Sequence, residues 1–195
     1  MDAGEFLRRY IAGERDFSNA DLSGANLSGA NLIEAHLVEA DLTKANLMGA
    51  DLSAADLTGA NLRDADLTGA TLCWVRLYEA NLIGANLMGA NLTESNLMCA
   101  DLTGANLSRA QFNHAHLCHA KLVGANLTQA DMSFADAENA HLNSADLTGA
   151  RLSWTKFKEA NLSGARVSRA QLEEARSLNR AIMPDGTTGT YARLR

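Results

Sequence analysis

The chain has little that could bend or cross-link it. Its 195 residues include one proline and three cysteines, and only 5% are aromatic. Proline therefore sets few bends, and a core must be built from small aliphatic side chains, for which the 47% hydrophobic content is ample. The cysteines are odd in number and scattered, which indicates reduced thiols and a cytoplasmic protein. The sequence also lacks a signal peptide and an apolar run of the roughly 18 residues that a membrane span needs, so no membrane contact is expected.

Basic residues are scarce in one half of the sequence. The formal net charge is −6, but residues 16–100 hold 11 acidic against 3 basic residues, whereas residues 101–175 hold 8 against 7. An acidic N-terminal half disfavours direct binding to nucleic acid, whose backbone attracts basic surfaces. The same acidic charge is compatible with a basic protein partner.

A five-residue pattern dominates the chain. From Ala20 onward Ala-(Asp/Asn)-Leu-X-X recurs without insertion, and its central positions run from Phe17 to Leu172, which makes 32 repeats. An α-helix turns about 500° in five residues and would spread the leucines around its surface. A straight strand would send successive leucines to opposite faces. The chain must therefore turn a corner in every repeat, with Ala and Leu inside and Asp or Asn outside.

The two residues after each Leu are expected to form that corner. Glycine occupies the second of these positions in eleven repeats, and glycine suits the positive φ that a type II turn requires there. Corners of one sense close the chain into a coil, and successive coils can then pair as parallel strands about 4.8 Å apart.

The tandem pattern over about residues 15–175 resembles the pentapeptide-repeat family. The resemblance implies an all-β fold, namely a right-handed quadrilateral parallel β-helix with 20 residues in each coil and therefore about eight coils. The spacing alone leaves a three-sided coil open. In a 20-residue coil Ala137 would stack between Leu117 and Phe157, which puts a larger ring beside a smaller side chain.

The ends of such a rod need closing because a terminal coil exposes apolar residues and unpaired edges. We expect three segments: a short capping α-helix in residues 1–13, the repeat coil in residues 14–175, and a C-terminal cap or tail in residues 176–195. The first segment carries an apolar helical face, and the last contains a short extended piece and a turn at residues 181–186. The final residues are expected to be mobile.

One corner of the coil differs from the polar remainder of the surface. At 20-residue spacing it would carry aromatic side chains together with Glu94, and neighbouring outward positions add basic groups, Tyr and Met. Such a composition is typical of an interaction patch, although bulky side chains can also simply cover turns. The candidate partner-binding residues are Trp74, Arg76, Tyr78, Met98, His114, Phe134 and Trp154.

A second group contains possible metal ligands, because imidazole and thiolate bind zinc. The candidates are His116, Cys118, His119 and Cys99, but their spacing is not a zinc signature and a convex surface rarely converges three ligands. Solvated side chains are the favoured interpretation, with no cofactor. No phosphate loop, nucleophile elbow or concave pocket is recognisable, so we expect no enzyme activity.

The sequence therefore favours a non-enzymatic protein-binding or scaffold module, monomeric or weakly dimeric, with an unidentified protein partner. Its first and last segments are similar to those of cyanobacterial pentapeptide-repeat proteins, some of which are linked to heterocyst differentiation, and this implies a regulatory role. A second hypothesis is DNA mimicry, because quinolone-resistance members of the family resemble a duplex and bind DNA gyrase. A third is a passive structural spacer.

Overall fold

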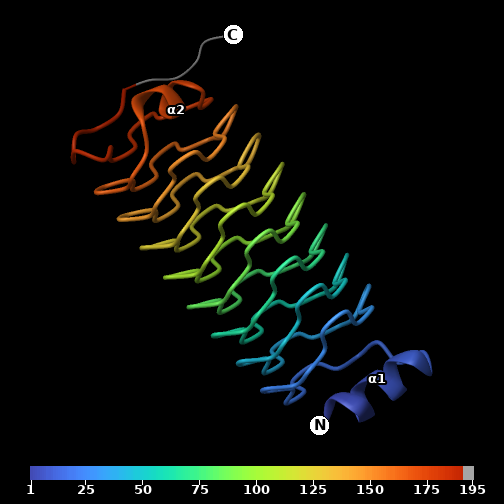
Figure 1. The fold of residues 1–195 in the computed structure, drawn as a ribbon. Helices are drawn as coiled ribbons and strands as arrows, with labels where there is room; N and C mark the ends of the chain where they lie inside the picture. Colours follow the sequence, from blue (N-terminus) through green and yellow to red (C-terminus); the bar gives the residue numbers. More distant parts are fainter. Residues whose placement is uncertain (191–195) are drawn as a thin grey trace.

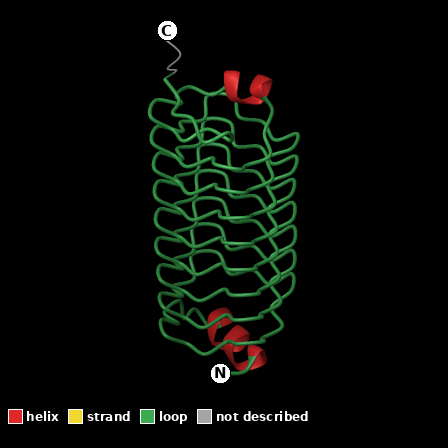
Figure 2. Ribbon diagram, turned by 90° about the vertical axis from the view of Figure 1, so that its left-hand side faces the viewer, coloured by secondary structure: helices red, strands yellow, loops and turns green. Residues whose placement is uncertain are grey.

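The computed structural model describes residues 1–190, which form a rod of stacked coils (Figures 1 and 2). Helix α1, Ala3–Ile11, lies across the N-terminal end of the rod, and the short helix α2, Arg169–Glu173, lies at the other end. Neighbouring coils are joined by isolated parallel β-bridges, beginning with Asp16 to His36. Most bridges join residues 20 apart and follow one another every five residues, so that each coil carries four. Residues 1–190 contain no continuous strand, because each repeat pairs through one residue before the chain turns.

The corner of each repeat is a hydrogen-bonded turn. The N–H of Ala100, for example, donates to the C=O of Leu97 at 3.1 Å, and the same bond recurs along the rod. At every fifth position from Asn19 to Gly164 the residue has a positive φ. Eleven of these residues are glycine, as a type II turn requires, but the others carry side chains in a region that costs about 1 kcal/mol relative to glycine. The repeat thus imposes this conformation on whichever residue stands there.

The Leu and Ala positions fill the inside of the coils, as expected. From Ala35 to Leu147 these side chains are almost fully shielded from solvent. Ser95 and Thr155 replace Ala and are equally buried, and their hydroxyls donate to the backbone carbonyls of Leu92 and Met132 at 2.6 and 2.8 Å. These bonds satisfy the two buried polar groups, so they do not carry the penalty of an unpaired hydroxyl.

The outward Asp and Asn side chains brace the turns. Asp21 Oδ1 accepts hydrogen bonds from the backbone N–H of Ser23 at 3.0 Å and from its hydroxyl at 2.7 Å. Asn26 makes the same pair of bonds with Ser28. A short side chain that bonds the backbone two residues ahead favours a turn over an extended strand. The residue between Ala and Leu therefore helps to start the next corner.

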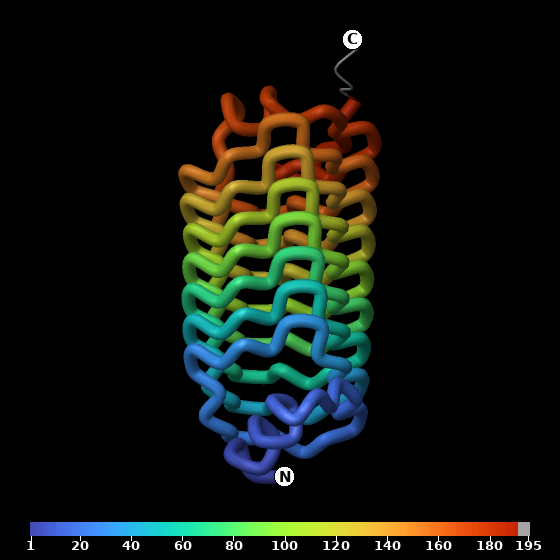
Figure 3. Tube along the Cα trace, turned by 90° about the vertical axis from the view of Figure 1, so that its right-hand side faces the viewer, coloured from blue at the N-terminus to red at the C-terminus, as the bar shows by residue number. Residues whose placement is uncertain are grey.

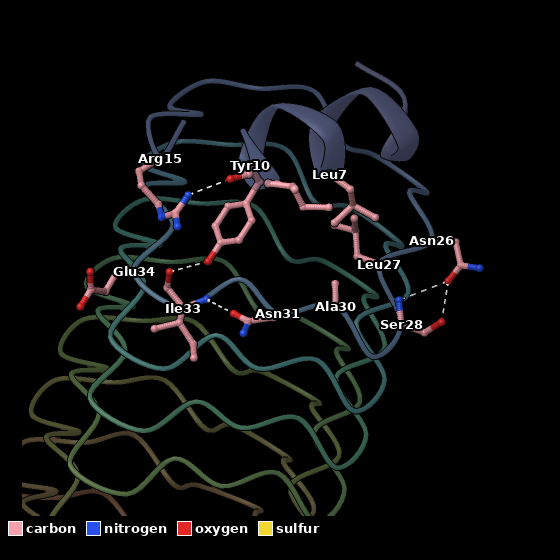
Figure 4. A pocket seen from close by; sticks show the side chains of 11 residues that line it. Leu7, Tyr10, Arg15, Asn26, Leu27, Ser28, Ala30, Asn31, Ile33 and Glu34 are labelled. Atoms are coloured by element: carbon pink, nitrogen blue, oxygen red, sulfur yellow. Dashed lines mark hydrogen bonds between the residues drawn. The ribbon is translucent and has the colours of Figure 1, made fainter. Parts of the chain in front are cut away.

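Helix α1 closes part of the first coil. Asp2 caps it by accepting from the N–H of Glu5 at 2.8 Å, while Phe6 packs edge-on against Phe17 with ring centroids 4.4 Å apart. The hydroxyl of Tyr10 donates to the backbone carbonyl of Ile33 at 2.8 Å, and this bond ties helix α1 to the coil (Figure 4). Of the predicted apolar face, Phe6 and Tyr10 are buried, but Ile11 is 82% exposed beside an open hollow of about 640 Å³.

The C-terminal end differs from the expected repeat. The pattern was predicted to run unbroken to Leu172, but α2 replaces that repeat, because Ser168 and Gln171 form a capping box. The Gln171 amide donates to the carbonyls of Leu147 and Ala150 at 2.7 and 2.8 Å, which bonds the edge of the preceding coil. The Ser168 and Gln171 pair was a sequence signal for a helix start that the five-residue pattern obscured.

Coil pairing then resumes beyond residue 175 with one extra residue. Lys156 bridges Ser177 and Asn161 bridges Ile182, each at a spacing of 21. The turn expected at residues 181–186 is present, since the N–H of Gly186 donates to the carbonyl of Met183. Figure 3 shows this last part of the chain closing the end opposite the N-terminus.

The final residues are predicted to be mobile, but residues 191–195 lie outside the part of the chain that the structure describes. No helix in residues 1–190 has the length and apolar character needed to cross a bilayer.

Phe157 should fill the space that Ala137 leaves in its column. Both side chains are fully buried, as is Leu117 on the preceding coil. We expect Phe157→Leu to lower the free energy of unfolding by about 1 to 2 kcal/mol, because it leaves a void. Adding Ala137→Leu should restore most of that loss, as measured by urea denaturation. If the second substitution instead deepens the loss, the two side chains do not share the space.

The braced aspartates should make stability depend on pH. Hydrogen bonds from the Ser18 and Ser23 side chains and N–H groups hold the pKa values of Asp16 and Asp21 below their ordinary range. A carboxyl with a depressed folded-state pKa stabilises above its unfolded pKa, near 3.9, and this stabilisation disappears as pH falls further. Asp16→Asn with Asp21→Asn keeps both acceptors, as Asn26 shows. That variant should lose less stability than the parent between about pH 4 and pH 2 in urea titrations.

Candidate functional site

Five turn residues form a continuous column on one edge of the rod: Trp74, Glu94, His114, Phe134 and Trp154, here called the aromatic edge. Backbone hydrogen bonds between turns place each residue on the coil next to the previous one. The Trp74 indole N–H donates to Glu94 Oε2 at 3.1 Å, and the His114 and Phe134 rings stack with centroids 5.0 Å apart and planes 5° from parallel. Four of the predicted partner-binding residues are thus brought together.

These side chains are exposed although they stand at a strained turn position. Trp74 and Phe134 are 58% and 50% exposed, and both have a positive φ, as do His114 and Trp154. Glycine occupies the equivalent position in eleven other turns, where it avoids the penalty on the Cβ. Because the repeat imposes a positive φ at every turn, the conformation does not distinguish this edge. Its particular feature is the exposed apolar area that the ring side chains add.

The face beside the aromatic edge carries ion pairs between successive coils. Arg76 pairs with Asp56 at 3.1 Å, and Lys156 pairs with Asp136 at 2.7 Å. Partial burial opposes ionisation of Asp136, but its bond to Lys156 holds the pKa of that carboxyl below its ordinary value. The two carboxylates were not among the predicted site residues. Opposite charges 20 residues apart were the signal that could have found them.

A shallow hollow of about 400 Å³ lies where this face meets the aromatic edge. Turn residues and face residues contribute equally to its lining, which consists of Glu94, His114, Phe134, His116, Asp136 and Lys156. The hollow joins apolar ring surface to two carboxylates and one ammonium group. Such a mixture can hold a polar side chain of a partner against an apolar wall.

The remaining candidates, Tyr78 and Met98, lie at the opposite border of the same face. The N–H of Glu79 bonds the carbonyl of Met98, which places Tyr78 and Met98 on adjacent coils. Tyr78 is 37% exposed, whereas Met98 is half-buried. The seven predicted partner-binding residues therefore occupy one face and its two borders.

The proposed metal ligands do not gather. Within residues 1–190 no group of three His, Cys, Asp or Glu side chains is placed to hold a metal ion. Cys118 is half-buried, its thiol lies 3.9 Å from the carbonyl oxygen of Asp136, and burial together with Asp136 raises the pKa of the thiol to about 11. Zinc needs a deprotonated thiol, so the surroundings of Cys118 oppose metal binding. The other candidates, His116, His119 and Cys99, are exposed side chains.

The sequence of the repeat region matches the family described as pentapeptide repeats, in eight copies over residues 16–53, 55–94, 95–133 and 125–164. The chain belongs to the pentapeptide-repeat family. The match indicates no catalytic family. No curated protein matches the chain.

Several solved structures are similar to this pentapeptide-repeat protein. HetL, from the cyanobacterium Nostoc sp. strain PCC 7120, is 41% identical, with 97% of this chain and 100% of that chain covered and a TM-score of 0.45. Rfr23 from the cyanobacterium Cyanothece 51142 is 26% identical, covers 89% and 98% of the two chains and has a TM-score of 0.28. QnrB1, a plasmid-mediated fluoroquinolone resistance protein, is 21% identical over 79% and 80%, with a TM-score of 0.44. The kinship with HetL rests on its sequence identity over nearly the whole chain.

Two thiols of this pentapeptide-repeat protein, Cys99 and Cys118, should differ in reactivity. Cys99 is exposed, whereas burial and Asp136 raise the pKa of Cys118 to about 11. Thiolate is the reacting species, so iodoacetamide at pH 8 should alkylate Cys99 well before Cys118. The alkylation rate of Cys118 should rise as the pH approaches 11. Peptide mass spectrometry on Cys99→Ser and on the parent would measure both rates. Equal rates at pH 8 would contradict this environment for Cys118.

Proposed function

We propose that this pentapeptide-repeat protein is a non-enzymatic protein-binding module that holds its partner on the aromatic edge and the adjoining face. The observation that carries the proposal is the column of exposed side chains on one edge, four of whose five members carry rings, at turn positions where glycine would be less strained. Aromatic side chains supply large contact areas at little entropic cost and are enriched in interface centres. An exposed aromatic edge of this kind also favours a binding role over a passive spacer.

The kinship with HetL supports a regulatory setting for that binding. HetL is described as a pentapeptide-repeat protein involved in the regulation of heterocyst differentiation, and it is 41% identical to this chain over its full length. We infer that this chain is likewise a regulatory module of a cyanobacterium, acting in the cytoplasm as a monomer or weak dimer. The family membership supports a right-handed quadrilateral β-helix as its form, divided at residues 13 and 175 as the sequence indicates.

DNA mimicry is the less favoured function. A mimic needs a continuous negative surface, but the later coils carry regularly spaced bases that pair with the acids of the preceding coil. Such pairs join Lys121 to Asp101, Arg151 to Asp131, Lys156 to Asp136 and Arg166 to Asp146. These pairs leave the acidic character concentrated in the first coils.

Removing the outer rings of the aromatic edge should weaken partner binding without unfolding the protein. We expect Trp74→Ala with Trp154→Ala to weaken binding by at least about tenfold, because hot-spot aromatics each contribute about 2 kcal/mol. The partner would be captured from cyanobacterial extract with the parent chain, identified by mass spectrometry and then titrated in purified form.

Met48→Ala with Met88→Ala is the matched control. These side chains are 47% and 42% exposed and lie on a different edge, two coils apart, whereas Trp74 and Trp154 lie four coils apart. The control should bind as the parent does, and both variants should keep the parental melting temperature within a few degrees. Equal affinity of the Trp variant and the parent for the purified partner would remove the aromatic edge from the binding site.

A further inference from the structure

Glu94 carries the only carboxylate among the five side chains of the aromatic edge. Its neighbours along the aromatic edge are Trp74 on one side and His114 on the other, and the Trp74 indole donates to its Oε2 at 3.1 Å. No hydrogen bond to Oε1 is present within the described residues. The carboxylate is exposed and held by a single neutral donor. One of its two oxygens is therefore open to a donor from a partner.

The basic groups near Glu94 are already engaged with other carboxylates. Arg76 pairs with Asp56 on the preceding coil, away from Glu94, and Lys156 pairs with Asp136. Within residues 1–190 no basic side chain forms an ion pair with Glu94. The hollow holds the carboxylates of Glu94 and Asp136 beside the single ammonium of Lys156, so an additional cation complements its carboxylates.

The surroundings of Glu94 suit a guanidinium better than an ammonium. Trp74 is 58% exposed, and tryptophan is the aromatic side chain that attracts cations most strongly. Arginine is planar, less strongly hydrated than lysine, and can stack on a ring while its N–H groups bond a carboxylate. A shallow, partly wet site favours the cation that loses less hydration on binding.

We propose that Glu94 and Trp74 form a receptor for an arginine side chain of the partner. The guanidinium donates to Glu94 and lies against the Trp74 indole, and the aliphatic part of the arginine packs along the hollow beside His114 and Phe134. This receptor rests on the proposed protein-binding function and adds the chemistry that the partner must present there.

The receptor can be tested without knowing the partner. N-acetylarginine amide would be titrated into the ¹⁵N-labelled full chain at low salt, with the indole N–H resonance of Trp74 as the reporter, assigned by Trp74→Phe. N-acetylcitrulline amide is the neutral control of the same shape. We expect a saturable shift with the arginine compound, weakened at least about threefold by 0.5 M NaCl, and no saturable shift with citrulline.

Glu94→Gln removes the charge but keeps an acceptor for the Trp74 indole, so the side chains stay in place. It should weaken arginine binding by about threefold to tenfold. Glu34→Gln is the matched control, because Glu34 occupies the same turn column at a positive φ without an aromatic neighbour in the next repeat of that column, Ala54. Equal shifts with citrulline, or parental affinity in Glu94→Gln, would overturn the receptor.

The same variants separate this inference from the proposed function. If the Trp74 and Trp154 double variant loses the purified partner while Glu94→Gln binds it with parental affinity, the binding edge stands and the arginine receptor falls. If the arginine compound binds at Glu94 but the double variant keeps full affinity for the partner, the proposed binding edge falls, and Glu94 and Trp74 form an arginine site that this partner does not occupy.

Discussion

Backbone hydrogen bonds between coils fix a register of 20 residues, and this register decides which side chains become neighbours. Each outward residue donates its N–H to one coil and its C=O accepts from the same coil, as Asn46 does with Ala25 and Leu27. The chain turns after every Leu, so the pairing cannot extend into longer strands. Buried Leu and Ala columns and the outward polar columns follow from this constraint.

The turns carry a conformational cost that the coil tolerates. A positive φ at every fifth residue is easy for glycine and unfavourable for other residues. The fold holds these turns through inter-coil backbone bonds and through Asp or Asn side chains that bond the residue two positions ahead. A turn position can therefore accept a bulky ring without losing its shape, and the outer surface is free to vary while the inside stays constant.

Bulky aromatic turn residues are distributed unevenly over the edges of the rod. Trp74, His114, Phe134 and Trp154 share one edge, whereas the turns of other edges carry mostly glycine and small polar residues. Because stacking is periodic, substitutions 20 residues apart build a surface about as long as the rod itself. A binding site can thus arise on such a rod without a cavity or an inserted loop.

The sequence determined the repeat, the inside positions and the turn positions, because each follows from a period that neither a helix nor a straight strand can satisfy. It determined the capping helix through the apolar helical face of the first segment. It also placed the aromatic residues in one column, since that needs only the 20-residue register implied by the family resemblance. The structure decided what the period could not express: α2 in place of the Leu172 repeat and the shift to a 21-residue spacing after it. It also shows that the candidate metal ligands do not form a group of three within residues 1–190. It also decided which charges pair, so that Arg76 and Lys156 turn toward the preceding coil while Glu94 bonds an indole. Side-chain direction and helix capping depend on contacts in three dimensions, and a one-dimensional pattern does not contain them.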